Sequence, residues 1–107
     1  MKRFGQVTRV KPQKLEEYEK LHADAWPGVL KMIKECNIRN YSIFHRNHFL
    51  FAYFEYIGDD FESDMAKMAN DPETRRWWDV CVPCLDLERP DAEGEWWSDM
   101  EEVFHCD

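Results

Sequence analysis

Tyr18 and His22 form the first pair whose residue types and spacing suit proton transfer. They stand four positions apart within residues 14–36, where apolar residues recur at helical spacing, so both side chains fall on one helix face. Leu15 and Ala25 share that face, which therefore points inward. A phenol beside an imidazole in a half-buried position can donate or accept a proton near neutral pH. The same pattern equally fits a structural tyrosine and histidine in the core, and spacing alone leaves both interpretations open.

Trp77 and Trp78 directly follow Arg75 and Arg76 in a second predicted helical stretch. Adjacent helical residues point about 100° apart, so we expect one indole to pack in the core and the other to border a pocket. Flat indole faces suit the C–H-rich faces of sugar rings, and the indole N–H can donate to a hydroxyl. Two structural tryptophans beside a helix end fit the composition as well.

Tyr41 is the third candidate. In the strand predicted for residues 38–45, alternation places Tyr41 on one face together with Arg39 and Ile43. Tyr41 then points either toward the same pocket as His22 or into the core.

Cys81 and Cys84 have the spacing of a redox-active dithiol motif. That motif normally follows a strand and opens a helix, whereas this pair ends a predicted helical stretch. A zinc site that adds His105 or Cys106 is the other alternative, but neighbours on a strand point apart, so only one of these two easily reaches a shared metal. We therefore expect neither a redox centre nor a bound metal.

The order of the elements follows from periodicity, turn residues and capping residues. A strand ends before Pro12, the long helix is interrupted at Trp26-Pro27-Gly28, and an aspartate stands at the start of each later helix. The predicted elements are a strand at 2–10, a helix at 14–36, strands at 38–45 and 49–57 joined by a hairpin turn at 46–48, helices from 59 or 60 and from 71 to about 82, an irregular stretch at 83–99 and a strand at 100–105.

This order is the α+β, ferredoxin-like βαββαβ arrangement, an antiparallel sheet with helices on one face. The 107 residues are enough for one domain, which we assign to residues 1–107. The other face of the sheet stays uncovered in a chain this short. We therefore expect two chains to pair through their sheets as a homodimer, a dimeric α/β barrel with an enclosed pocket.

Charge and composition restrict the partners. The 14 lysines and arginines against 22 aspartates and glutamates give a net charge of −8, which repels phosphate backbones and anionic lipid. Nucleic acid and membrane surfaces are therefore excluded as expected partners, whereas a neutral sugar is compatible with this charge. The first thirty residues do not resemble a signal peptide, and no run is long and apolar enough to cross a membrane, so a cytoplasmic location is expected.

Taken together, several segments resemble the L-rhamnose mutarotase family across nearly the whole chain. They are the run from Glu16 through Tyr18, His22 and Trp26-Pro27, then Asn40-Tyr41-Ser42-Ile43, the strand at 49–55, Arg76-Trp77-Trp78 and the closing Met100-Glu101-Glu102-Val103-Phe104. The stretch from Cys84 to Trp97 departs from the Asn-Pro-Asp-Asn-Ser type of motif found in the family's rhamnose enzymes. The departure affects the rim of the pocket and hence the choice of sugar.

The resemblance implies a dimeric, cofactor-free enzyme that interconverts the α and β anomers of a 6-deoxy-hexose by acid/base ring opening and reclosure. L-Rhamnose is the expected sugar and L-fucose the alternative. The resemblance further implies that His22 is the proton donor and that Tyr18, Tyr41, Trp77 and Trp78 contact the substrate.

Two other classes fit the same topology. One is a dimeric α/β-barrel oxygenase or haem-handling protein, which would bind a coloured cofactor or consume oxygen. The other is a non-catalytic sugar-binding module, which would respond to sugar without accelerating anomer exchange.

Overall fold

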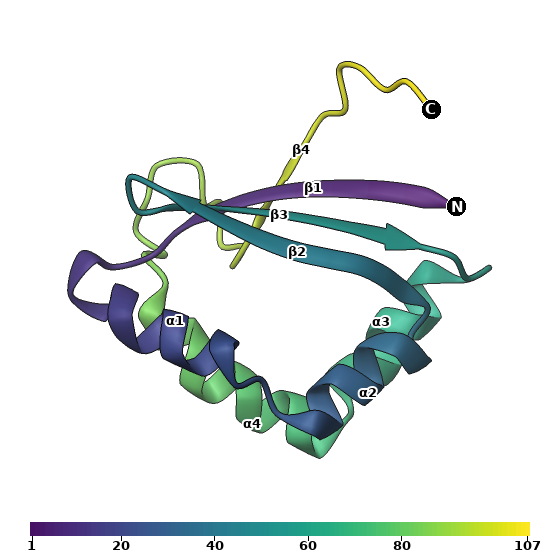
Figure 1. The fold of residues 1–107 in the computed structure, drawn as a ribbon, viewed down its shortest axis with the longest axis horizontal. Helices are drawn as coiled ribbons and strands as arrows, with labels where there is room; N and C mark the ends of the chain where they lie inside the picture. Colours follow the sequence, from purple (N-terminus) through teal and green to yellow (C-terminus); the bar gives the residue numbers. More distant parts are fainter.

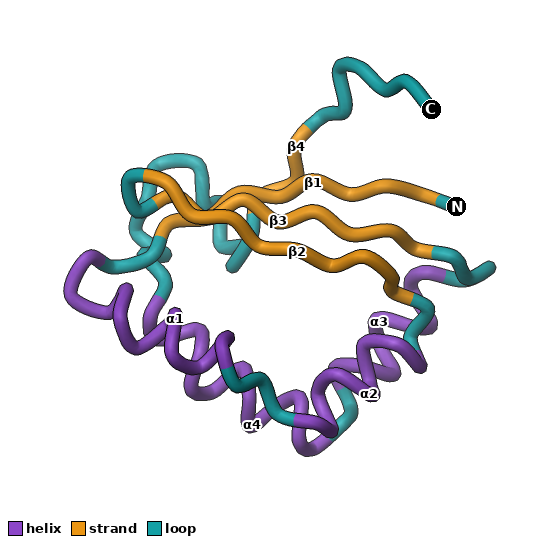
Figure 2. Tube along the Cα trace, in the orientation of Figure 1, coloured by secondary structure: helices purple, strands orange, loops and turns teal.

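A computed structural model describes residues 1–107 as one four-stranded antiparallel sheet with helices on one side (Figures 1 and 2). The strands lie in the order β2-β3-β1-β4. Their bounds are β1 Lys2–Arg9, β2 Ile38–Arg46, β3 Phe49–Tyr56 and β4 Ser98–Met100. The helices are α1 Leu15–Ala23, α2 Pro27–Glu35, α3 Phe61–Ala69 and α4 Pro72–Cys81, with short 3₁₀ turns at Pro12–Lys14 and Val82–Cys84. The predicted ferredoxin-like architecture is confirmed.

Alternation along β3 separates the two faces of the sheet. Leu50, Ala52 and Phe54 are buried, because they face the helices. Phe49 and Phe51 point the other way and remain more than a third exposed. The helices therefore cover one face of the sheet and leave the opposite face open.

Local signals set most element boundaries as predicted. The turn between β2 and β3 consists of Asn47 and His48, both with positive φ (52° and 66°), as a two-residue type I′ hairpin turn requires. Asp60 caps α3 by accepting from Ser63 N at 3.1 Å. Asp71 caps α4 in the same way, through Thr74 N.

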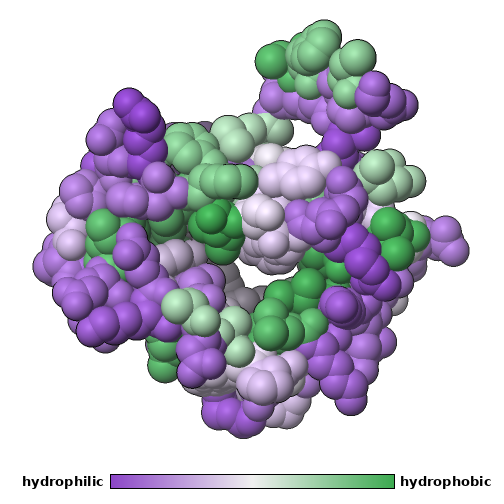
Figure 3. All heavy atoms as spheres, in the orientation of Figure 1, coloured by the Kyte–Doolittle hydropathy of each residue, from purple (hydrophilic) through white to green (hydrophobic).

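The long helix predicted for residues 14–36 is interrupted where expected. Pro27 occupies the first turn of α2, where its missing N–H leaves no bond unmade. The break turns α2 away from α1, so the helices form two arms that meet in a V beneath the sheet, with α1 and α4 in one arm and α2 and α3 in the other (Figures 1 and 2). α4 packs against both α2 and α3. The space-filling view shows the molecule hollowed at its centre, between the sheet and the helices (Figure 3).

The final strand differs from its prediction. It pairs with β1 over Ser98–Met100, opposite Val7 to Gly5, and not over residues 100–105. The apolar pair Val103 and Phe104 suggests a strand, but both side chains lie outside the core, 87% and 81% exposed. Glu102 still pairs with Arg3 of β1 at 2.9 Å, and the chain beyond it extends away from the sheet (Figure 1). None of the helices has the length and apolar character needed to cross a bilayer.

Candidate active site

The structure brings Tyr18 and His22 together on α1. Their rings stack with centroids 4.0 Å apart and an interplanar angle of 26°. His22 Nδ1 lies 2.9 Å from the carbonyl oxygen of Tyr18. A carbonyl oxygen can only accept, so Nδ1 carries a proton and donates it, which leaves the lone pair of Nε2 free. Burial lowers the pKa of His22, and this backbone hydrogen bond offsets part of that decrease. The imidazole is therefore neutral at pH 7, with Nε2 ready to accept a proton.

Trp77 fixes the ring of His22 from α4. The two rings meet edge to face at 5.1 Å, and Trp77 makes a similar contact with Trp26 at 5.2 Å. Trp77 is 7% exposed and forms a small core with Val29 and Cys81. The predicted divergence of the two tryptophans is confirmed, because the adjacent Trp78 is only half-buried.

A bulge in β2 determines the direction of Tyr41. The register with β3 shifts between Arg39, opposite Glu55, and Ser42, opposite Tyr53, and Asn40 takes a positive φ of 52°. Tyr41 consequently faces the helices and contacts the buried ring of Phe54, with centroids 5.4 Å apart.

The predicted grouping of Tyr41 with Arg39 is therefore wrong. Arg39 lies on the outer face, because the extra residue of the bulge reverses the alternation between the two positions.

Tyr18, Tyr41 and Cys81 lie close enough to influence one another's ionisation. Burial raises the pKa of Tyr18, and the nearby Tyr41 phenol and Cys81 thiol raise it further. Burial likewise raises the pKa of Tyr41 to about 12, with Cys81 again contributing. Both hydroxyls therefore stay protonated at neutral pH and can serve as hydrogen-bond donors.

Tyr41 combines an exposed side chain with a raised pKa, because it faces the hollow between the sheet and the helices. Its side chain retains 40% of its surface although protein surrounds it closely enough to desolvate the hydroxyl. We therefore take the hollow beneath the sheet (Figure 3) as the candidate site, with its candidate side chains carried by α1, α4 and β2.

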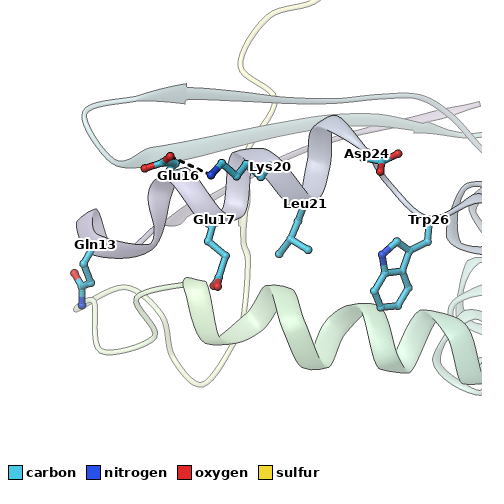
Figure 4. Close-up of a pocket in the computed structure, with 7 residues that line it drawn as sticks. All are labelled: Gln13, Glu16, Glu17, Lys20, Leu21, Asp24 and Trp26. Atoms are coloured by element: carbon cyan, nitrogen blue, oxygen red, sulfur yellow. Dashed lines mark ion pairs between the residues drawn. The ribbon is translucent and has the colours of Figure 1, made fainter.

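A separate groove of about 590 Å³ lies beside α1 and does not hold these residues (Figure 4). Glu17, Leu21 and Trp26 point from it toward α4, while Lys20 pairs with Glu16 at 3.2 Å on the opposite side of the helix (Figure 4). It is an open, mostly charged surface groove. It contains none of the aromatic hydroxyl or imidazole groups, so we place the candidate active site in the hollow.

The cysteines do not form the grouping that a zinc site would need. Cys84 is fully buried in the 3₁₀ turn and donates to Glu17 Oε2 at 3.2 Å, whereas Cys106 is exposed in the C-terminal tail. The chain contains no group of three histidine, cysteine or acidic side chains placed to hold a metal ion. Burial raises the pKa of Cys81 to about 12 and that of Cys84 to about 11, so both are neutral thiols at pH 7.

Residues 83–99, predicted to be irregular, contribute aromatic contacts that the sequence pattern does not predict. Trp96 contacts Trp78 edge to face at 5.3 Å, and Trp97 packs against the core that contains Tyr18. The available signal was the Trp96-Trp97 doublet in an otherwise acidic stretch. No periodic pattern links a loop to the helix on which it folds, so the doublet could not be placed.

A ferredoxin-like fold that packs a neutral imidazole between the Tyr18 phenol and the Trp77 indole, beneath its sheet, defines a small α+β protein equipped for acid/base chemistry on a neutral ligand. Residues 3–106 match the model of the L-rhamnose mutarotase family, and the chain belongs to that family.

Its relatives match over their whole length. The L-rhamnose mutarotase of Oceanobacillus iheyensis is 37% identical, and that of Bacillus subtilis 34% identical, each with 100% of both chains covered. The crystal structure of an L-rhamnose mutarotase from Formosa agariphila has the same fold, with a TM-score of 0.78 at 24% identity and full coverage of both chains. Tetracenomycin F2 cyclase from Streptomyces glaucescens shares the fold at 15% identity and a TM-score of 0.69, also with full coverage. The chain is accordingly an isomerase, a mutarotase that interconverts sugar anomers.

Proposed function

We propose that this mutarotase acts on L-rhamnose, with L-fucose as the alternative 6-deoxy sugar, and that His22 carries the proton. The observation that supports this most directly is the packing of the His22 ring between Tyr18 and Trp77, with Nδ1 committed to a backbone carbonyl and Nε2 free. The relatives at 37% and 34% identity are L-rhamnose mutarotases.

The mechanism uses the neutral form of His22 first as a base. Nε2 takes the proton from the anomeric hydroxyl, the O1–C1 bond becomes a carbonyl, and the C1–O5 bond breaks. The imidazolium then returns the proton to O5, which becomes a hydroxyl of the open-chain aldehyde. Rotation about C1–C2 presents the other carbonyl face, and the reverse steps close the ring as the opposite anomer. The role of proton donor implied by the family resemblance is the second half of this relay.

Tyr18 and Tyr41 complement this relay. Their pKa values are raised by burial, so both remain hydroxyl donors when negative charge develops on O1 or O5. Donors held in place in a site that excludes most water stabilise such charge more than water does, because they need not reorganise during the reaction.

Trp77 and Trp78 contribute binding. Trp77 also holds His22, so its replacement by alanine would lower kcat as well as raise KM. Trp78 is half-buried and makes no contact with His22, so Trp78→Ala should raise KM more than it lowers kcat.

We further propose that two chains pair through the outer face of the sheet. Phe44 is 64% exposed there, beside Phe49 and Phe51, and a contiguous apolar surface of this kind is typical of an interface. The exposed Val103 and Phe104 of the tail project from the same chain and would gain cover from a second copy.

The test is exchange NMR of the anomeric protons at anomeric equilibrium, with L-rhamnose and L-fucose in parallel and the His22→Ala variant as control. Enzyme-dependent exchange with one sugar that is lost in the variant supports the assignment and names the substrate. Full activity of His22→Ala would contradict the role of His22. Binding without exchange would identify a sugar-binding module, and haem uptake or oxygen consumption would indicate the oxygenase class.

A further inference from the structure

The segment from Leu85 to Trp97 is built around one buried cation, Arg89, whose side chain is 2% exposed. Nη2 donates to the carbonyl oxygens of Glu95 and Trp96, both at 3.3 Å, and to Ser98 Oγ at 3.1 Å. Nη1 donates to the carbonyl oxygen of Asp86 at 3.2 Å. Nε lies 3.5 Å from the Asp91 carboxylate without the geometry of a hydrogen bond.

Such a network specifies one shape for the loop. A guanidinium removed from water is strongly disfavoured unless its donors find partners, so the loop must keep these carbonyls around Arg89. The two ends of the segment are also fixed. Asp86 N donates to Arg9 O at 2.7 Å, and Ser98 Oγ donates to Asp91 O at 3.0 Å.

The hydrogen bonds of Arg89 determine the position of Trp96. Its carbonyl is held by Arg89, and its ring meets Trp78 with centroids 5.3 Å apart at an interplanar angle of 70°. The neighbouring Trp97 anchors the segment on the core that contains Tyr18. Trp96 nevertheless keeps 41% of its surface exposed, although the loop that carries it is tightly bonded.

We propose that Trp96 and Trp78 form an aromatic corner that receives the C5–C6 methyl edge of a 6-deoxy sugar. Trp96 is then a specificity-determining residue, and Arg89 is a positioning residue that acts through it. The proposal rests on the proposed function, because it assigns the methyl group of that substrate to this pair of indoles, of which Trp78 adjoins the Trp77 that contacts His22. Two indoles at a steep angle present a face and an edge that together enclose an apolar group, whereas a hydroxyl there would find no partner in either ring face.

The experiment compares L-rhamnose with L-lyxose, which has the same ring hydroxyl arrangement but lacks the methyl group. A hydrophobic pocket that accommodates one extra carbon discriminates by about 10–200-fold in kcat/KM, and we expect the wild-type protein to favour L-rhamnose within that range. Trp96→Ala should raise KM for L-rhamnose and bring the ratio close to one, with little change for L-lyxose. If L-fucose is the better substrate, D-arabinose replaces L-lyxose as the methyl-free partner.

Arg89→Met should shift the ratio in the same direction, because the carbonyls that hold Trp96 lose their donor. Leu87→Ala is the matched control: Leu87 is 40% exposed in the same loop and takes no part in the Arg89 network, so its ratio should equal that of the wild type. Thermal unfolding followed by circular dichroism identifies any variant that does not fold. If Arg89→Met unfolds, Trp96→Ala alone decides the matter.

An unchanged sugar ratio in a folded, active Trp96→Ala variant would overturn the aromatic corner and leave the proposed mutarotase substrate intact. Absence of exchange by the wild-type protein with every sugar would instead overturn the proposed substrate. The two failures are therefore distinguishable.

Discussion

The two faces of the sheet are both rich in aromatic side chains, yet they differ in what surrounds the rings. On the helix-facing side, Tyr41 and Phe54 meet the imidazole-bearing helix α1 across a hollow, and burial is the leading cause of the raised pKa of Tyr41. On the outer side, Phe44 and Phe51 stand exposed.

The outer face also has shifted groups, but for a different reason. The pKa of Glu55 is lowered chiefly by hydrogen bonds from Tyr53 and Asn40, and both partners lie at the surface. Both faces are rich in aromatic residues, so aromatic content alone does not locate a reaction site. A desolvated imidazole with a free nitrogen beside desolvated phenols does so, and His22, Tyr18 and Tyr41 supply these groups on the helix-facing side.

The largest expected effect comes from His22, the imidazole carried by α1. His22→Gln should lower the exchange rate at saturating sugar by about 10²–10⁴-fold, because the amide cannot relay a proton. Exchange NMR measures the rate, and the melting curve should stay close to that of the wild type. His105→Gln, in the exposed tail, is the control and should keep full activity. Equal losses of exchange activity in both variants would contradict a specific role for His22.

The pH dependence of the exchange rate tests the protonation state of His22. Burial lowers the pKa of His22 below its usual 6.5, so the base form persists through neutral pH and the rate should fall about tenfold per unit only below that lowered pKa. The sign of the stability effect agrees. The unfolded chain binds the proton first, so the stabilisation present above pH 6.5 declines as the pH falls from there toward the folded-state pKa. A rate that instead decreases as the pH rises through neutrality would make the imidazolium the resting form.

A substitution on the outer face should change the oligomeric mass of the protein and not its exchange activity. Phe44→Glu places a charge in the proposed interface, so light scattering during size-exclusion chromatography should show the mass of one chain, near 13.0 kDa. Exchange activity should persist, since Tyr18, His22, Tyr41 and the Trp77-Trp78 pair all come from one chain. Ile57→Glu, also exposed but outside the outer-face strands, should keep the wild-type mass. A monomeric wild type would refute the interface.

The smallest effect concerns the thiols. Cys106 is exposed and should react rapidly with a disulfide reagent such as dithiobis-nitrobenzoate, whereas Cys81 and Cys84 should react only on unfolding, because burial keeps them protonated. Cys81→Ala should change kcat little, and a large loss of activity in that variant would return the cysteine pair to consideration as a functional centre.

Short-range sequence signals determined a large part of the fold. The spacing of Tyr18 and His22 places them on one helical face because a helix repeats every 3.6 residues, and the hairpin turn and both aspartate caps follow from the chemistry of a few adjacent residues. Pro27 marks the break between α1 and α2 for the same local reason.

Only the tertiary structure decided the features that depend on distant partners. The bulge at Asn40 reverses an alternation that the sequence of β2 presents as regular, and it turns Tyr41 into the hollow. Arg89 gathers carbonyls from both sides of its loop and thereby brings Trp96 onto Trp78, a contact between residues 18 positions apart. The length of β4 likewise depends on whether Val103 and Phe104 find a surface to cover. These outcomes depend on burial and on the pairing of polar groups far apart along the chain, and such long-range contacts leave no period in the sequence.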